Sequence, residues 1–66
     1  MRLTINGQHK DITGASNVAD IVAQFCKNPA HVITEINGNI VPNDLWGKTT
    51  LKDGDFLELV AFVGGG

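Results

Sequence analysis

Three consecutive glycines, Gly64, Gly65 and Gly66, are the residues of this sequence best suited to chemistry, because Gly66 would present the α-carboxylate of the chain. A carboxylate resists substitution until it is activated, and attack on the α-phosphate of a nucleotide would convert it into a mixed anhydride. Glycine has no Cβ atom, so such a tail can thread a narrow channel. Three extended residues reach roughly 10 Å. The glycines therefore predict a flexible tail, residues 64–66, that serves as a substrate handle on a domain formed by residues 1–63.

The other reactive side chains predict structural roles. Cys26 is the single cysteine and cannot form an internal disulfide. It lies beside an apolar helical stripe near the end of the predicted helix, where a thiol lacks the positive potential that stabilises a thiolate. His9 and His31 are too far apart in sequence to form a local metal-binding pair, and Asp53-Gly54-Asp55 lacks the other ligands of a calcium loop. We expect two surface histidines, a simple turn and no metal site.

Composition limits the class of protein. The chain has 66 residues, 42% of them apolar, and a net charge of −2 from five basic and seven acidic residues. This length allows one small domain. No basic cluster supports nucleic-acid binding, and the longest apolar run, Leu59 to Val63, is far shorter than the roughly 20 residues that span a bilayer. With a single cysteine and no apparent signal peptide, we expect a cytoplasmic protein with no nucleic-acid or membrane partner.

The elements that must position the tail begin with a hairpin. Leu3 and Ile5 alternate with polar residues, and Asn6-Gly7 is a strong hairpin turn. The following strand, Gln8 to Ile12, is polar enough to be an edge strand.

One helix follows the hairpin. Ser16 and Asn17 are N-cap candidates, and Asp20 is placed to favour the positive end of the helix dipole. Asn28-Pro29 ends the helix. An apolar stripe on this helix is predicted to face the core, and its members are Val18, Ile21, Val22 and Phe25.

Shorter elements complete the chain. We predict a third strand at Val32 to Asn37, a turn at Asn37-Gly38 and a short strand at Ile40-Val41. Residues 42–48 are expected to place Leu45 and Trp46 in the rim of the core. The nearly continuous apolar run from Phe56 to Val63 indicates a central strand. This order predicts an α+β fold, a β-grasp (ubiquitin-like) roll in which one main helix packs on one face of a mixed sheet.

Alternation along the last strand predicts two faces. Leu57, Leu59, Ala61 and Val63 would face the helix. Phe56, Val60 and Phe62 would face outward, and an exposed apolar patch of this kind often marks a protein interface.

Several short motifs occur in a characteristic order. They are Asn6-Gly7, Val18-Ala19-Asp20-Ile21-Val22, Ile36-Asn37-Gly38-Asn39-Ile40-Val41-Pro42, Trp46, Leu51-Lys52-Asp53-Gly54-Asp55, Leu57-Glu58-Leu59-Val60 and the ending Val63-Gly64-Gly65-Gly66. Together they cover essentially the whole chain. In this pattern the sequence resembles the ubiquitin-like sulfur-carrier family, and within it the carriers of thiamine biosynthesis. Asn43 departs from the pattern, because arginine often follows the Val-Pro pair there, and no contact role is transferred to it.

The resemblance implies a carrier rather than an enzyme, with no cofactor bound to the chain itself. Gly66 would be adenylated by an E1-like adenylating enzyme that uses ATP and Mg, and then converted to a thiocarboxylate with sulfur from a persulfide sulfur donor. The thiocarboxylate would deliver sulfur to thiazole synthase. Gly65 and Gly66 correspond to the terminal diglycine of the family.

Three alternatives remain open at this stage. A sulfur carrier for molybdopterin synthesis would use the same tail chemistry, although Phe62-Val63 stands where those relatives tend to carry prolines. A protein modifier would form isopeptide bonds through Gly66. A simple interaction domain would use the glycines only as a linker.

Overall fold

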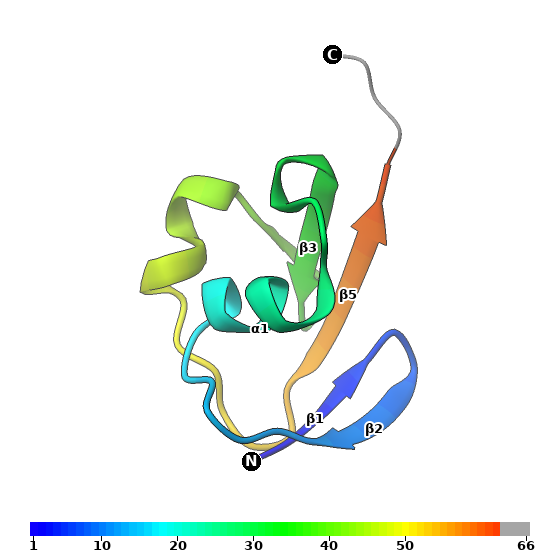
Figure 1. The fold of residues 1–66 in the computed structure, drawn as a ribbon. Helices are drawn as coiled ribbons and strands as arrows, with labels where there is room; N and C mark the ends of the chain where they lie inside the picture. Colours follow the sequence, from blue (N-terminus) through cyan, green and yellow to red (C-terminus); the bar gives the residue numbers. More distant parts are fainter. Residues whose placement is uncertain (63–66) are drawn as a thin grey trace.

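The computed structural model describes residues 1–62 and shows a five-stranded mixed sheet with one main helix (Figure 1). The sheet order is β2-β1-β5-β3-β4, in which β1 and β5 are parallel and the other neighbours are antiparallel. The elements are β1 (Arg2–Ile5), β2 (Gln8–Asp11), α1 (Val18–Phe25), η1 (Pro29–His31), β3 (Val32–Ile36), β4 (Asn39–Val41), η2 (Asn43–Lys48) and β5 (Phe56–Ala61). The predicted β-grasp roll is confirmed, with β2 at an edge and β5 in the centre.

Two Asn-Gly pairs turn the chain where the sequence predicted a hairpin and a second turn. The φ angles are 51° at Asn6 and 80° at Gly7, and 50° at Asn37 and 86° at Gly38. Positive φ at both central residues gives a turn whose twist matches that of the flanking strands, and asparagine and glycine tolerate it best. These turns therefore fix the register of β1 against β2 and of β3 against β4.

Helix α1 begins with a reciprocal cap. The side chain of Asn17 accepts a hydrogen bond from the Asp20 N–H at 2.9 Å, and the Asp20 carboxylate accepts one from the Ser16 N–H at 2.9 Å. The latter bond is the main reason that the pKa of Asp20 lies below its ordinary value. At the other end, the Cys26 N–H donates to the carbonyl oxygen of Val22, and the backbone then becomes extended. The helix thus ends at Phe25, three residues before the predicted stop at Asn28.

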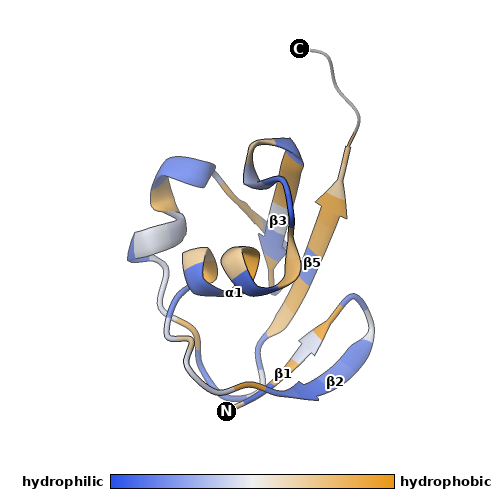
Figure 2. Ribbon diagram, viewed as in Figure 1, coloured by the Kyte–Doolittle hydropathy of each residue, from blue (hydrophilic) through white to orange (hydrophobic). Residues whose placement is uncertain are grey.

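The core lies between α1 and the face of the sheet that the helix covers, where apolar residues gather (Figure 2). Val18, Ile21 and Val22 of the predicted stripe are buried. Phe25 is not, because 42% of its surface is exposed. It occupies the final position of an eight-residue helix, so no further turn covers it. The other buried apolar residues are Leu3, Ile5, Ile12, Val32, Val41, Trp46, Leu51 and Leu57.

A second prediction fails on η2. Trp46 is buried, and its indole N–H donates to the carbonyl oxygen of Val41 at 3.0 Å. Leu45 remains 44% exposed. Successive residues of a 3₁₀-helix point about 120° apart, so two adjacent residues cannot both enter the core.

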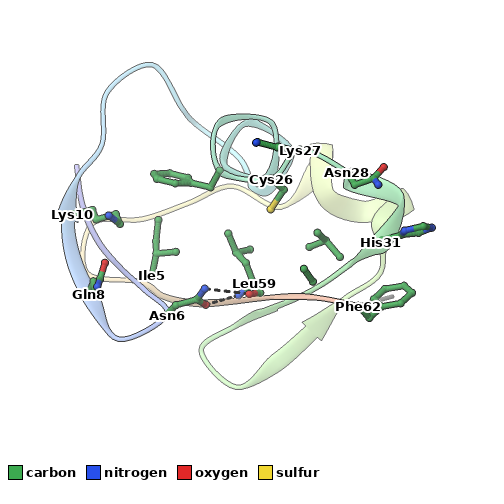
Figure 3. A pocket seen from close by; sticks show the side chains of 13 residues that line it. Ile5, Asn6, Gln8, Lys10, Cys26, Lys27, Asn28, His31, Leu59 and Phe62 are labelled. Atoms are coloured by element: carbon green, nitrogen blue, oxygen red, sulfur yellow. Dashed lines mark hydrogen bonds between the residues drawn. The ribbon is translucent and has the colours of Figure 1, made fainter. Parts of the chain in front are cut away.

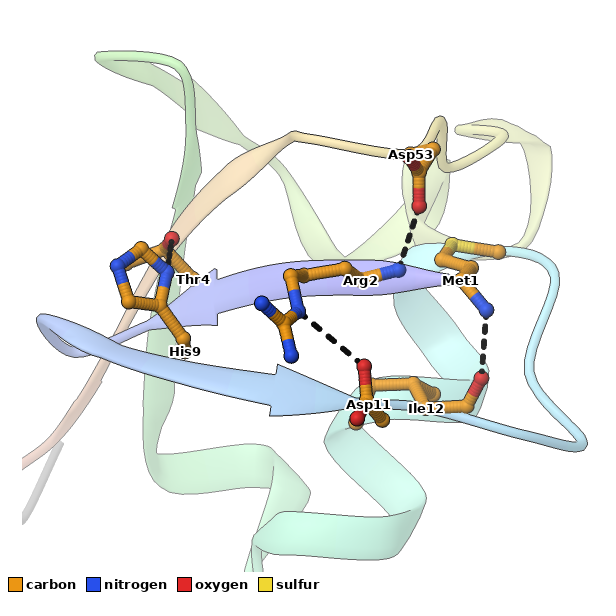
Figure 4. A network of polar contacts seen from close by, with 7 residues as sticks. All are labelled: Met1, Arg2, Thr4, His9, Asp11, Ile12 and Asp53. Atoms are coloured by element: carbon orange, nitrogen blue, oxygen red, sulfur yellow. Dashed lines mark hydrogen bonds and ion pairs between the residues drawn. The ribbon is translucent and has the colours of Figure 1, made fainter.

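Polar contacts on the far side of the sheet tie β1 to its neighbours (Figure 4). The Arg2 N–H donates to the carboxylate of Asp53 at 2.6 Å, and the Arg2 guanidinium pairs with Asp11 at 3.2 Å. The hydroxyl of Thr4 lies 3.0 Å from Nδ1 of His9. His9 is exposed, as predicted, and Asp53 belongs to the predicted turn.

Candidate functional site

The predicted site residues fall into two groups. Gly64, Gly65 and Gly66, with Val63 before them, lie outside the described residues. The described chain ends at Phe62, whose N–H donates to the carbonyl oxygen of His31 at 2.9 Å. What the structure shows of the site is therefore its base: strand β5 and the surfaces around it.

Asparagine side chains fasten β5 from both neighbouring turns. Asn6 donates from Nδ2 to the carbonyl oxygen of Leu59 at 3.2 Å and accepts the Leu59 N–H on Oδ1 at 2.7 Å. Asn37 accepts the Phe56 N–H at 3.0 Å and donates to the buried carboxylate of Asp55 at 3.0 Å. Together the two turns fix the beginning and the middle of the strand that leads to the glycines.

The bonds of Asn6 extend the sheet beyond its regular pairing. Strand β1 pairs with β5 only as far as Ile5 opposite Leu57. The Asn6 side chain then binds both backbone groups of Leu59, as another strand residue would. Beyond Leu59, β5 is paired on the β3 side alone.

The outward face of β5 carries two of the predicted patch residues, Phe56, which is 60% exposed, and Val60, which is 49% exposed. The third, Phe62, follows the end of the strand; it is 40% exposed and lines the groove described below together with Leu59 and Ala61 of the other face. Val60 is joined across the strands by Ile33, which is 44% exposed. Between Phe56 and Val60, Glu58 stands opposite Glu35. The apolar surface is therefore strongest around Val60, and its role in partner contact stays a prediction.

On the face of β5 toward the helix, the side chains become less buried along the strand. Leu57 is buried, Leu59 is half-buried and packs against the core, and Ala61 is exposed. Val63, the fourth residue predicted for this face, lies outside the described residues. The decrease arises because α1 covers β5 near Leu57 and leaves its later residues open.

That opening is a groove of about 580 Å³ between the β1–β2 turn, the end of α1 and the end of β5 (Figure 3). Two aromatic side chains line it: Phe25, over which the Lys10 ammonium lies 5.6 Å from the ring centroid, and Phe62, whose ring centroid lies 5.6 Å from that of His31. The sequence reasoning missed this groove. Its lining comes from three separate stretches of the chain, residues 5–10, 25–32 and 59–62, and the one available signal was an aromatic residue at the last position of a short helix. The lining residues are Ile5, Asn6, Gln8, Lys10, Phe25, Cys26, Lys27, Asn28, His31, Val32, Leu59, Ala61 and Phe62.

Cys26 lines the groove in a half-buried position and packs against the core. Burial raises the pKa of its thiol, which favours the unreactive protonated form at neutral pH. Among residues 1–62, no group of three potential ligands is placed to hold a metal ion. Every helix in that stretch is too short or too polar to span a bilayer.

A mixed sheet of this order, with one main helix across one face and the central strand leading to terminal glycines, defines a ubiquitin-like β-grasp domain. The sequence profile of the ThiS family matches residues 3–66. The chain belongs to the ThiS family.

A solved structure supports this assignment. The crystal structure of a thiamine biosynthesis protein (ThiS) from Geobacter metallireducens superposes with a TM-score of 0.83 at 36% sequence identity, and the match covers the whole of both chains. The sulfur carrier protein ThiS of Escherichia coli is 27% identical, again over the full length of both chains.

A longer relative is also similar. A protein named thiazole synthase, from Paramagnetospirillum magneticum, is 35% identical over 66 residues. The match takes in all of this chain but only 20% of that relative's length.

Proposed function

We propose that this chain is the sulfur carrier of thiamine biosynthesis and that Gly66 is the residue that carries the sulfur. The observation that carries the proposal is the family match, which extends through Gly66. The matches to two proteins named ThiS support it, because each covers the whole of both chains.

The chemistry begins with activation of the Gly66 carboxylate. An E1-like adenylating enzyme, using ATP and Mg, would join a carboxylate oxygen to the α-phosphate and release pyrophosphate. The terminal sulfur of a persulfide sulfur donor would then attack the acyl carbon and displace AMP. Cleavage of the sulfur–sulfur bond by a thiol reductant would leave a thiocarboxylate on Gly66.

In this scheme the chain is a co-substrate and supplies no catalytic group. Its own contribution is to present the tail from a rigid base. The bonds between the Asn6 side chain and the Leu59 backbone, and the bond from the Phe62 N–H to the carbonyl oxygen of His31, hold β5 up to the last described residue. A base held on both sides lowers the conformational entropy that a partner must remove when it captures the tail.

The acceptor that we propose is thiazole synthase. The similarity to a segment of a protein with that name supports this choice, because a carrier segment within the acceptor chain would meet its target at high effective concentration. For this separate chain, sulfur transfer would follow docking between two proteins.

Intact-mass spectrometry tests the proposal. The chain is incubated with an E1-like adenylating enzyme, ATP, Mg and a persulfide donor, and a chain lacking Gly66 serves as the control. We expect a mass gain equal to the replacement of one oxygen by sulfur, mapped to Gly66 and absent in the control. No gain, with the enzyme active on another carrier, would contradict the proposal. Adducts that survive reductant and boiling would instead indicate a protein modifier.

We also propose that the outward patch of Phe56, Val60 and Phe62 contacts the adenylating enzyme. Val60 is the sharpest probe because its exposed side chain stands opposite the exposed Ile33. Val60→Asp is expected to raise the KM for the carrier without changing its thermal unfolding. Ile40→Asp is the control, since Ile40 is 67% exposed but lies on edge strand β4, two strands from β5. Equal effects of the two substitutions would argue against the patch.

A further inference from the structure

The groove combines apolar walls with a basic rim in a chain that is acidic overall. Lys10 and Lys27 line it, and so does His31, whereas none of its described lining residues is Asp or Glu. The whole chain has seven acidic and five basic residues. A positive rim on a negatively charged protein selects a ligand that carries negative charge.

The walls of the groove favour a ligand that also carries apolar side chains. Phe25 and Phe62 are 42% and 40% exposed, and both line the groove together with the half-buried Leu59. Exposed aromatic residues in a concave surface are typical anchors for side chains of a partner.

The backbone of β5 adds a third kind of contact. In the antiparallel ladder the Phe62 N–H faces β3, where it donates to His31. The ladder alternates, so the backbone N–H and C=O of Ala61 point to the opposite side. On that side β1 has already ended, and Ala61 lines the groove. An extended segment placed there would continue the sheet from the point at which Asn6 stops.

We infer that the groove is a docking site for an extended protein segment that carries acidic and apolar side chains and belongs to the enzyme that activates the C-terminal carboxylate. The acidic side chains would pair with Lys10 and Lys27. The apolar side chains would fill the space between Phe25 and Phe62, and the segment's backbone would bond to Ala61.

The position of the groove selects this partner. Phe62 lines the groove and is followed by Val63 and then by the tail. An enzyme that holds the carboxylate of Gly66 must approach over this end of β5. The inference rests on the proposed function, because it assigns the segment to the enzyme that captures the tail.

Charge reversal at matched positions tests the inference. The double variant Lys10→Glu with Lys27→Glu reverses the rim. The double variant Lys48→Glu with Lys52→Glu makes the same change at two exposed lysines that do not line the groove. Each pair takes the formal net charge from −2 to −6, since every replacement adds −2. The single variant Lys27→Glu leaves Lys10 over the ring of Phe25. It therefore tests the rim charge even if the loss of Lys10 disturbs folding in the double variant.

The assay is adenylation of the carrier, measured as pyrophosphate release at several carrier concentrations. We expect the groove pair to raise the KM for the carrier at least about tenfold with kcat unchanged, whereas the control pair changes it less than about threefold. Lys27→Glu alone should give an intermediate rise. Added salt should raise the KM of the unmodified carrier and have a much smaller effect on the groove pair.

Equal effects of the two pairs would show that only overall charge matters and would overturn the docking site. No effect of either pair would overturn it as well. Both results differ from failure of the proposed function, in which the unmodified chain itself releases no pyrophosphate; that outcome would overturn both proposals.

Discussion

Replacement of Asn6 by glycine is the most direct test of how β5 is held. Glycine accepts the positive φ of 51° at this position without strain, so Asn6→Gly removes the side chain and leaves the turn unstrained. The variant loses two hydrogen bonds, at 3.2 and 2.7 Å, between the side chain and the backbone of Leu59. Any loss of stability beyond the general effect of glycine therefore measures these bonds.

The expected magnitude follows from the two bonds. A typical hydrogen bond contributes a net 0.5–1.5 kcal/mol, and Asn6 is exposed, so water partly replaces what is lost. We expect a decrease of about 1–2 kcal/mol in the free energy of unfolding. For a domain of this size each kcal/mol shifts Tm by about 4–8 °C, which gives a shift of about 4–16 °C.

Urea denaturation and thermal unfolding measure the decrease, and Asn28→Gly is the control. Asn28 is exposed, and its side chain makes no capping bond to the short helix that it precedes. Hydrogen exchange provides a local readout, because the Leu59 N–H should exchange faster in Asn6→Gly alone. The reasoning is refuted if both variants lose the same stability and the exchange of Leu59 is unchanged.

Three further predictions concern the helices and the thiol. Trp46→Ala should lower the free energy of unfolding by about 3–5 kcal/mol, whereas Leu45→Ala should cost less than about 1 kcal/mol, because only the tryptophan is buried; urea denaturation compares them, and similar losses would contradict the assigned burial. The lowered pKa of Asp20, caused chiefly by the hydrogen bond from Ser16, stabilises the fold above the pKa of the unfolded state and loses that effect as the pH falls through the folded value. The unfolding free energy of Asp20→Asn should therefore fall less than that of the unmodified chain between pH 5 and about pH 3, and parallel pH profiles would count against this linkage. Burial raises the pKa of the Cys26 thiol, so iodoacetamide should alkylate it more slowly at neutral pH than it alkylates glutathione, and mass spectrometry would reveal an equal or faster rate as a failure.

Local signals made much of the fold predictable. The Asn-Gly pairs and the cap at Asn17 act over a few residues, and each appears in the structure at its predicted place. The central position of β5 was predicted from its apolar run, and the structure confirms it, although only one face of the strand is covered and Phe56 and Val60 on the other face are exposed.

Two residues that were predicted for the core are exposed, and the spacing of apolar residues along the chain could not reveal either error. Phe25 continues the helical stripe, but the helix ends before another element covers it. Leu45 sits beside Trp46, and the geometry of a 3₁₀-helix allows only one of these neighbours to enter the core. Both residues are apolar, and their types alone do not reveal where the surrounding chain stops.

The candidate site divides in the same way. Its chemical end, Gly66, is predicted from three glycines and from a family resemblance; it lies outside the described residues and stays a prediction. The groove could not be predicted, because it exists only where β1 ends early, α1 ends early and β5 continues past both. Its basic character likewise arises from Lys10 and Lys27, which are 17 positions apart in the sequence.

The parallel pairing of β1 with β5 also has a mechanical consequence. The strands at the two ends of the chain are neighbours, joined by bonds from the Thr4 N–H to the carbonyl oxygen of Asp55 and from the Asn6 N–H to that of Leu57. Tension applied between Met1 and Phe62 would slide these parallel strands past each other, so the bonds, together with those of the Asn6 side chain, would resist in shear and share the load. A partner that binds the folded domain and pulls on the tail would therefore load all of these bonds at the same time. Separation of the two strands would require the bonds to break together and not one after another.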